Sequence, residues 1–252
     1  LKSNITCIRQ QPEDGSPLVG YCFLNLLQVL KLMPEKEMVK VADFYFVELK
    51  PILIRNREAT EIILDAFGAL GTNQTQQLLV ERVLLSDKPD KNLIVRLMTH
   101  VAGMEQPPVK EMISAMEDIC FRSELFPESL FVGDLHNRVL LALGSVVHKL
   151  SKSGDHEKAR EITDRVHSLL GLHDPWLYRQ KRETQTKKEK IEYDRYRAVL
   201  LETLGNARMD DSFDYIISHI NATNSPWIKR AGVHALRKYE HHMAADVLLT
   251  TA

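Results

Sequence analysis

The amino-acid sequence predicts an all-α fold, a two-layered, HEAT-like α-solenoid in which antiparallel helix pairs form a horseshoe. Apolar residues recur at helical spacing along the 252-residue chain, and no segment shows the strict alternation of a half-buried strand. Two stretches, Ala66–Leu79 and Leu201–Ile216, resemble each other: each is a helix that ends in Leu-Gly, a tight turn and a further amphipathic helix. Stacked helix pairs with an imperfect repeat are typical of α-solenoids, and a compact helical bundle is the alternative.

Capping and breaking residues set the expected helices in the first half of the chain. Ser16 and Pro17 suit the N-cap and first position of the first helix, and Pro34 ends it. Gly71 suits a left-handed helix C-cap, and Thr72 caps the next helix at once, so that the two helices form a tight hairpin. The helices expected here cover residues 17–33, 35–49, 58–70, 73–85, 91–102 and 109–120.

The second half repeats this pattern around a polar insert at residues 171–187. Gly205 and Asn206 are expected to form a turn, and Ser225-Pro226 to open a helix. The helices expected here cover residues 133–152, 155–170, 188–204, 211–220 and 227–239, with a last one from Glu240. We therefore expect a single α-helical superhelical domain over residues 1–252.

Composition excludes some classes of function. The chain has 33 basic and 34 acidic residues and a net charge of -1, which argues against a dedicated nucleic-acid binder. No apolar stretch reaches the roughly 18 residues of a transmembrane segment. The first residues, Leu1–Asn4, contain neither an initiating Met nor a signal peptide, so we expect a piece of a larger protein.

Three cysteines, an odd number, form no closed disulfide framework. Cys7 and Cys22 are a candidate disulfide across a short loop, which would stabilise the fold by about 3 kcal/mol. The alternative is that Cys22 belongs to the apolar stripe of its helix. Cys120 follows Met116 and Ile119 at helical spacing and is expected to be a buried thiol.

Several short motifs favour secretion. Candidate N-glycosylation sequons begin at Asn4, Asn73 and Asn221. All three fall in expected loops or at expected helix ends, where a glycan would face water. A candidate processing site of the kind cut by secretory-pathway convertases is formed by Arg179, Lys181 and Arg182. The alternative for this last motif is a solvated charged loop.

The segment Arg179–Arg197 holds eight basic residues against four acidic ones. Its second part is a candidate basic patch, made of Lys187, Lys188, Lys190, Arg195 and Arg197. Such a patch would attract an acidic partner, for example a receptor, a glycosaminoglycan or lipid headgroups. The alternative is a solvated helix in which acidic and basic side chains are interspersed.

Three segments, taken in order, resemble a known family. Ile63–Thr72 reads ILDAFGALGT and is followed by a helix that contains Gln76 and Gln77. Leu141–Leu150 reads LALGSVVHKL, and the end of the chain carries LGNA at Leu204–Ala207 and WIKRAGVHALRK at Trp227–Lys238. This set, over about residues 60–240, is similar to the helical domain of the N-terminal lipid-transfer module of large lipid transfer proteins. That family includes vitellogenin, apolipoprotein B, insect apolipophorin and the microsomal triglyceride transfer protein.

The resemblance implies a fold and a role. In the family this domain is a HEAT-like horseshoe around a lipid cavity, which is built by β-sheet domains of the same protein. The β-barrel expected before the helical domain and the lipid-lining sheets expected after it are not in this sequence. The resemblance therefore implies that lipid is a partner through the parent protein and not of this chain alone.

No catalytic constellation is evident. His234, His241 and His242 are not joined by cysteines or carboxylates at metal-ligand spacing. No G-x-S-x-G motif or phosphate-binding glycine-rich loop occurs, and nothing near Cys120 and His136 would activate a thiol. We expect no enzyme, no cofactor and no metal.

Two functional hypotheses follow. The first is a helical scaffold domain of a secreted lipid-transfer or lipoprotein-like protein. The second is a cytosolic HEAT- or armadillo-like adaptor that grips a protein or peptide in its groove. The sequons, the dibasic motif and the ordered family motifs favour the first. A secreted relative without lipid carriage is a variant of it.

Overall fold

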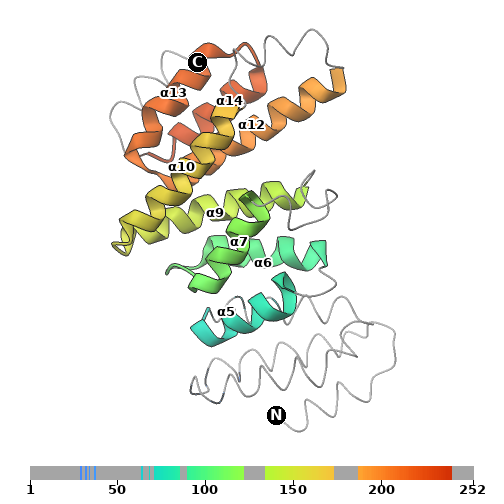
Figure 1. Ribbon diagram of the computed structural model, residues 1–252, viewed down its shortest axis with the longest axis vertical. Helices are drawn as coiled ribbons and strands as arrows, with labels where there is room; N and C mark the ends of the chain where they lie inside the picture. Colours follow the sequence, from blue (N-terminus) through green and yellow to red (C-terminus); the bar gives the residue numbers. More distant parts are fainter. Residues whose placement is uncertain are drawn as a thin grey trace. The chain divides into compact units, whose positions relative to one another are not determined.

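The computed structural model describes residues 71–85, 90–121, 134–172 and 187–239, with the single positions Val29, Leu32, Pro34, Glu37, Leu64 and Gly68. The secondary structure within these ranges is helical and contains no strand, which confirms the all-α prediction. The chain forms two compact units, Leu1–Met104 with Pro108–Ala115, and Glu105–Pro107 with Met116–Ala252. Figure 1 labels the helices in chain order. The prediction of a single domain stays a prediction.

The first continuous described range begins at Gly71, between the C-cap of one helix and the N-cap of the next. Gly71 has a φ of +60°, as the hairpin prediction requires, and Thr72 caps α5 (Asn73–Leu79) by accepting a 3.3 Å hydrogen bond from the Thr75 backbone N–H. A π-helical segment (Val80–Leu84) extends α5, and α6 spans Lys91–Gly103. Asp90 caps α6 by accepting hydrogen bonds from the N–H groups of Asn92 and Leu93. The α7 helix (Lys110–Phe121) begins in this unit.

Buried Gln76 ties the start of α5 to the chain just before α7. Its side-chain amide donates to the Gly71 carbonyl at 2.7 Å and accepts from the Val109 N–H at 2.7 Å. The side chain is only 3% exposed, so both bonds lie away from water. One glutamine thus satisfies two partly buried backbone groups.

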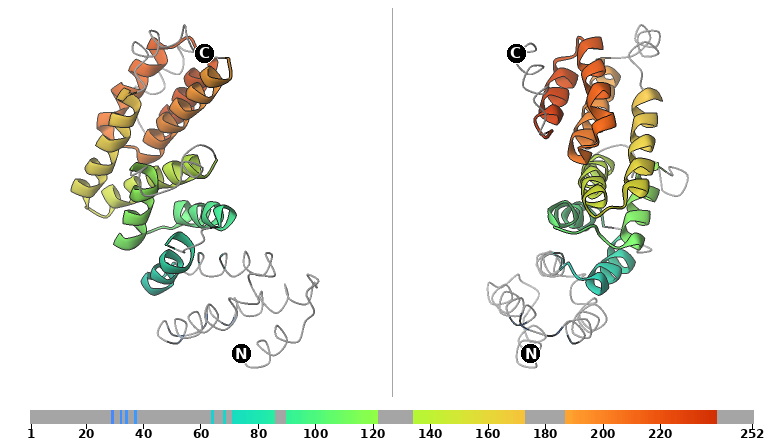
Figure 2. Two further views of the ribbon diagram at one scale, coloured as in Figure 1. Left: turned by 45° about the vertical axis from the view of Figure 1, so that its right-hand side comes forward. Right: turned by 90° about the vertical axis from the view of Figure 1, so that its left-hand side faces the viewer.

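The second unit is built around α12. Its helices after α7 are α9 (Asp134–Lys152), α10 (His156–Leu172), α12 (Lys187–Ala207), α13 (Phe213–Ala222) and α14 (Pro226–Leu236). The α12 helix packs against both α9 and α14, which are not its neighbours in the chain. The α10 helix contacts α9 and α12, and α13 contacts α14 (Figures 1 and 2). Fully buried side chains fill these contacts, among them Leu140, Leu143, Val146, Leu200, Leu201, Leu204, Ile216, Ile228 and Leu236.

Glycines allow these helices to approach closely. A Cβ atom on Gly144 of α9 would lie 2.3 Å from the Thr203 carbonyl oxygen of α12. On Gly205 of α12 it would lie 2.5 Å from the Cα of Ala235 in α14, closer than real Cβ contacts come. A side chain at either position would therefore force backbones apart.

The expected turn at Gly205-Asn206 is wrong. Both residues lie inside α12, which continues to Ala207, and the chain turns at Arg208, whose φ is +53°. Gly205 serves helix packing instead of a turn. Asn206 donates a 3.0 Å hydrogen bond from its side-chain amide to the Leu141 carbonyl in α9, and it accepts one from the Lys238 ammonium.

The cap at Ser225-Pro226 is where the sequence predicts it. Ser225 is the N-cap of α14, and Pro226 takes the first helical turn. The α14 helix buries one half of its surface through Ile228, Ala231, Gly232, Ala235 and Leu236. A Cβ atom on Gly232 would lie 2.4 Å from the Ile220 side chain of α13, so this contact is also closely packed.

Candidate functional site

Several predicted site residues lie outside the described part of the chain. They are the sequon at Asn4, the candidate disulfide of Cys7 and Cys22, and the candidate processing site of Arg179, Lys181 and Arg182. Of the polar insert at 171–187, Gly171 and Leu172 continue α10 and Lys187 begins α12. The disulfide, the cleavage and the remainder of the insert stay predictions.

The other two sequons are exposed at helix ends. Asn73 is the first residue of α5, and Asn221 lies in the last turn of α13. Both asparagine side chains face solvent, whereas Thr75 and Thr223, the third residues of the sequons, are buried. Both asparagines are therefore accessible to a glycan.

The structure separates the residues of the predicted basic patch into exposed and buried ones. Lys187, Lys188, Lys190 and Arg195 lie on α12, and the Arg195 side chain is exposed. Arg197 is only 2% exposed, so its inclusion in a surface patch is wrong. The reason is helical geometry: Arg197 stands three residues before the buried Leu200 and shares its inward face. Its guanidinium lies 5.9 Å from the centre of the Tyr193 ring, at the outer range of a cation–π contact.

Cys120 is a buried thiol, as predicted. It is 5% exposed, and burial raises the pKa of the thiol above its usual range, which keeps it protonated and unreactive. His136 contacts the backbone of Cys120: the ring Nε2 donates to the Cys120 carbonyl at 3.2 Å. The His136 ring also stacks on Tyr196, with centroids 5.7 Å apart. Burial is the main influence on the His136 pKa and lowers it.

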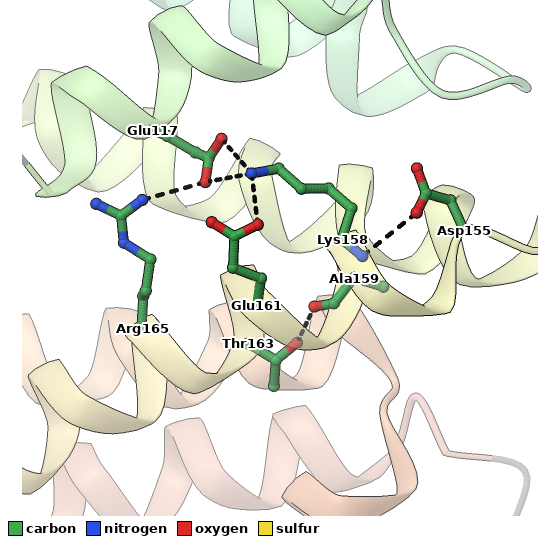
Figure 3. A network of polar contacts seen from close by, with 7 residues as sticks. All are labelled: Glu117, Asp155, Lys158, Ala159, Glu161, Thr163 and Arg165. Atoms are coloured by element: carbon green, nitrogen blue, oxygen red, sulfur yellow. Dashed lines mark hydrogen bonds and ion pairs between the residues drawn. The ribbon is translucent and has the colours of Figure 1, made fainter.

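An ion network around one buried carboxylate joins α7 to α10 (Figure 3). Glu117 on α7 has a side chain only 8% exposed, and two cations of α10 hold its carboxylate. The Lys158 ammonium lies 3.0 Å from Glu117 Oε2, and the Arg165 guanidinium lies 3.2 Å from Oε1. Lys158 also reaches Glu161 at 2.9 Å. Because the carboxylate has two charged donors, its removal from water is compensated.

Further contacts hold the two cations in place. The Arg165 guanidinium stacks over Phe121, 4.2 Å from the ring centre, at the end of the same helix as Glu117. Burial alone would lower the pKa of Lys158, but hydrogen bonds to Glu161 and Glu117 outweigh it and raise the pKa. The raised pKa keeps the Lys158 ammonium charged through neutral pH.

Sequence reasoning missed this network, although a signal was present. Glu117 follows Ile113 by four residues and precedes Cys120 by three, on the buried stripe of α7. Lys158 and Arg165 are seven residues apart and share one face of α10. An acidic residue within one apolar stripe and two cations on one face of another helix are the pattern of a buried ion contact.

No described residues form a metal site or a membrane span. Among them, no three His, Cys, Asp or Glu side chains gather where they could hold an ion. Nor is any described helix long and apolar enough to cross a bilayer. His234 is exposed on α14, and His241 and His242 lie outside the described ranges.

The described elements define an all-α protein whose polar contacts join helices to one another. Comparison with protein families is more specific. The model of the vitellogenin TPR domain matches residues 8–251, and the chain belongs to this family. The resemblance to the helical region of large lipid transfer proteins is thereby confirmed. Comparison with the curated proteins found no match.

Proposed function

We propose that this chain is the helical scaffold domain of a secreted lipid-transfer or lipoprotein-like protein. In this proposal, β-sheet domains of the same protein supply the lipid cavity, and the helices support it and present surfaces to partners. The observation that carries the proposal is the family match, which extends over residues 8–251 and so over almost the whole chain.

We further propose a two-layered α-solenoid, with the horseshoe shape expected of a lipid-cavity support. The contacts of α12 support it. Among the described helices, α10 lies between α9 and α12 in the chain and α13 lies between α12 and α14, yet α12 packs against both α9 and α14. Contacts between every second helix are what stacked helix pairs produce. We expected HEAT-like pairs, and the family's description names TPR units, which are also helix–turn–helix pairs.

Secretion is part of the proposal. It is supported by the exposure of Asn73 and Asn221 at helix ends, where glycans would be tolerated. We also propose that the domain has no enzymatic activity and needs no cofactor. The burial and high pKa of Cys120 and the structural use of His136 support this, since neither group is available to a substrate.

Isolation of the native protein from extracellular fluid tests the proposal. An antibody against α10 and α12 would capture the protein. The bound lipid would then be extracted, and the ratio of lipid mass to protein mass would be measured. We expect lipid to accompany the whole protein, and chain 1–252 expressed alone, as the control, to retain little. Recovery of the protein only from the cytosol and free of lipid would contradict the proposal.

A further inference from the structure

The end of α10 meets α13 through three aromatic rings. The ring centre of His167 on α10 lies 4.6 Å from that of Tyr215 on α13, and the Tyr215 ring lies 4.7 Å from the ring of His219, one turn further along α13. The Tyr215 hydroxyl donates to the His167 carbonyl at 3.4 Å. A Cβ atom on Gly171 would lie 3.6 Å from the same hydroxyl. Tyr215 therefore lies along the last turn of α10, in contact with two imidazole rings.

The His167 ring also meets a buried hydroxyl. Its Nε2 lies 3.0 Å from the Oγ of Ser212, which is buried and ends the short 3₁₀-helix η3 (Asp210–Ser212). A hydrogen bond also joins Ser212 to Tyr239, and the Tyr239 hydroxyl donates to the Leu204 carbonyl in α12 at 3.2 Å. His167 is thus the point where α10 joins a chain of hydrogen bonds that reaches α12.

The elements on either side of this contact are fixed by other means. The ion network with α7 holds α10 up to Arg165, two residues before His167. On the other side α13 packs closely on α14, where a Cβ atom on Gly232 would lie 2.4 Å from the Ile220 side chain. Residues 166–172, the last two turns of α10, lie beyond the ion network, and the His167 ring joins them to η3 and α13.

Carboxylates face the His167 ring from two elements. Asp164 stands three residues earlier on α10, and Asp211 belongs to η3; both raise the pKa of the ring. Burial is the larger influence, and it lowers the pKa below the usual 6.5. The other titratable side chains of this contact are Tyr215, His219 and Tyr239.

The closed contact therefore favours the neutral ring. Its contribution to stability is complete above pH 6.5 and falls as the pH drops from there through the lowered pKa. In a released end of α10 the His167 ring would regain water, while Asp164 on the same helix would stay beside it. Water and the carboxylate both favour the imidazolium, so acid favours the released end.

We propose that protonation of His167 releases the last two turns of α10, residues 166–172, from η3 and α13. The rest of α10 stays in place, because its ion network with α7 lies ahead of the released turns. Release uncovers the Tyr215 ring and the buried side chains of Val166 and Leu170, so that an apolar surface becomes available only in acid. This device responds to the pH around the protein and needs no lipid. It therefore does not rest on the proposed function.

Hydrogen exchange of the whole protein at pH 7.5 and pH 5.5 tests the proposal. Protection factors are compared, so that the intrinsic pH dependence of amide exchange cancels. The variant His167→Gln cannot be protonated but keeps groups that can hydrogen-bond to the Ser212 hydroxyl. His136→Gln is the matched control, because burial lowers the pKa of His136 as well.

In the parent we expect residues 166–172 to lose protection about tenfold between the two pH values, the limit for uptake of one proton over the pH unit below 6.5. At both pH values they should exchange faster than the middle of α9, because the release is local. The loss should disappear in His167→Gln and persist in His136→Gln. If glutamine loosens the end of α10 already at pH 7.5, His167→Phe, which keeps a ring against Tyr215, replaces it. A tenfold loss that persists in both His167 variants would overturn the proposal, as would its absence from the parent.

Discussion

Two contacts in the second unit hold helices together by different physical means. Where α12 meets α9 and α14, glycines let backbones approach until a single added carbon would clash. Where α7 meets α10, a carboxylate and two cations form the contact, and the cationic side chains are about one-third exposed, at 31% and 34%. The first contact is dry and depends on shape, whereas the second is polar and open to water at one side.

The difference indicates which contact is the more rigid. Close packing cannot be relaxed without moving a whole helix, because α12 is bounded by both α9 and α14. Long charged side chains can adjust, and water can replace a lost partner. We therefore expect α9, α12 and α14 to form the stable part of this unit, and the contact of α7 with α10 to be the more adaptable one.

The largest expected effect is that of Gly205→Ala. Alanine is normally better than glycine in a helix by about 1 kcal/mol, but here its methyl group meets the Ala235 backbone. We expect a net destabilisation of about 3 kcal/mol in urea unfolding. The matched control is Gly103→Ala at the end of α6, where nothing lies within 4 Å of the added carbon. A neutral or stabilising effect of Gly205→Ala would show that the close approach is not needed.

Glu117→Gln should have the next largest effect. The amide keeps the shape but loses the charge that Lys158 and Arg165 share, and we expect a loss of about 2 kcal/mol, reduced by the partial exposure of the cations. Glu157→Gln, on the exposed side of α10, is the control. High salt should shrink the difference between these two variants, but not the effect of Gly205→Ala. The same salt dependence for both contacts would mean that the contact of α7 with α10 is no more ionic than the contacts of α12.

Asn206→Ala tests a polar contact inside the closely packed region. The substitution leaves the Leu141 carbonyl without its amide donor and the Lys238 ammonium without its acceptor. We expect a cost of about 1 kcal/mol, with faster hydrogen exchange in α9 near Leu141. Asn224→Ala, at an exposed position before α14, serves as the control. Unchanged exchange in α9 would mean that Asn206 does not join the two helices.

We expect acid to lower the stability of the second unit through two histidines. This is the smallest of the predicted effects. Burial lowers the pKa values of His136 and His167 below the usual 6.5, and nearby Asp164 and Asp211 oppose this at His167. The folded state then favours the neutral rings, so their full contribution to stability is present above pH 6.5. It falls as the pH drops from there through the lowered pKa values.

Substitution of either histidine measures this effect. His167 Nε2 lies 3.0 Å from the Ser212 hydroxyl, and its ring centre lies 4.6 Å from that of Tyr215 on α13. In His167→Gln the fall of the unfolding midpoint between pH 7 and pH 5 should be shallower than in the parent. A steeper fall, or the same one, would mean that other groups cause the acid sensitivity.

Local signals were sufficient to predict the helices of the described ranges, while the helices expected at residues 17–33, 35–49, 58–70 and from Glu240 lie almost entirely outside those ranges. Gly71 and Thr72 act where the sequence predicts, because capping depends on neighbours a few residues away. Ser225 and Pro226 open α14 at the expected position, although the Ser225 side chain forms no capping hydrogen bond. The error at Gly205 shows the limit of such signals. A glycine near a helix end is normally a turn residue, and only the distant Ala235 explains why this one continues the helix.

The candidate sites were predicted less well for a related reason. Counting basic residues between 187 and 197 identified a charged segment, but the count ignored which side of α12 each residue occupies, and Arg197 is buried. In α14, by contrast, each side of the helix has its own residues, since small residues face α12 and α13 while the basic side chains are exposed.

The family motifs acquire a physical meaning in the structure. Gly144 comes from the second motif segment, Gly205 and Ala235 come from the two parts of the third, and the structure brings them together at α12. Gln76, next to the first motif, satisfies the backbone at Gly71 and Val109. The short family motifs thus contain glycines at which helices pack closely against one another.

Mass spectrometry of glycopeptides from the native protein tests most directly whether this domain belongs to a secreted lipid-transfer protein. Peptides that contain Asn73 and Asn221 would be compared before and after enzymatic removal of N-glycans, without reduction of the protein. The account predicts a glycan on at least one of the two exposed asparagines. Unmodified asparagines together with free thiols at Cys7 and Cys22 would contradict it and favour a cytosolic adaptor.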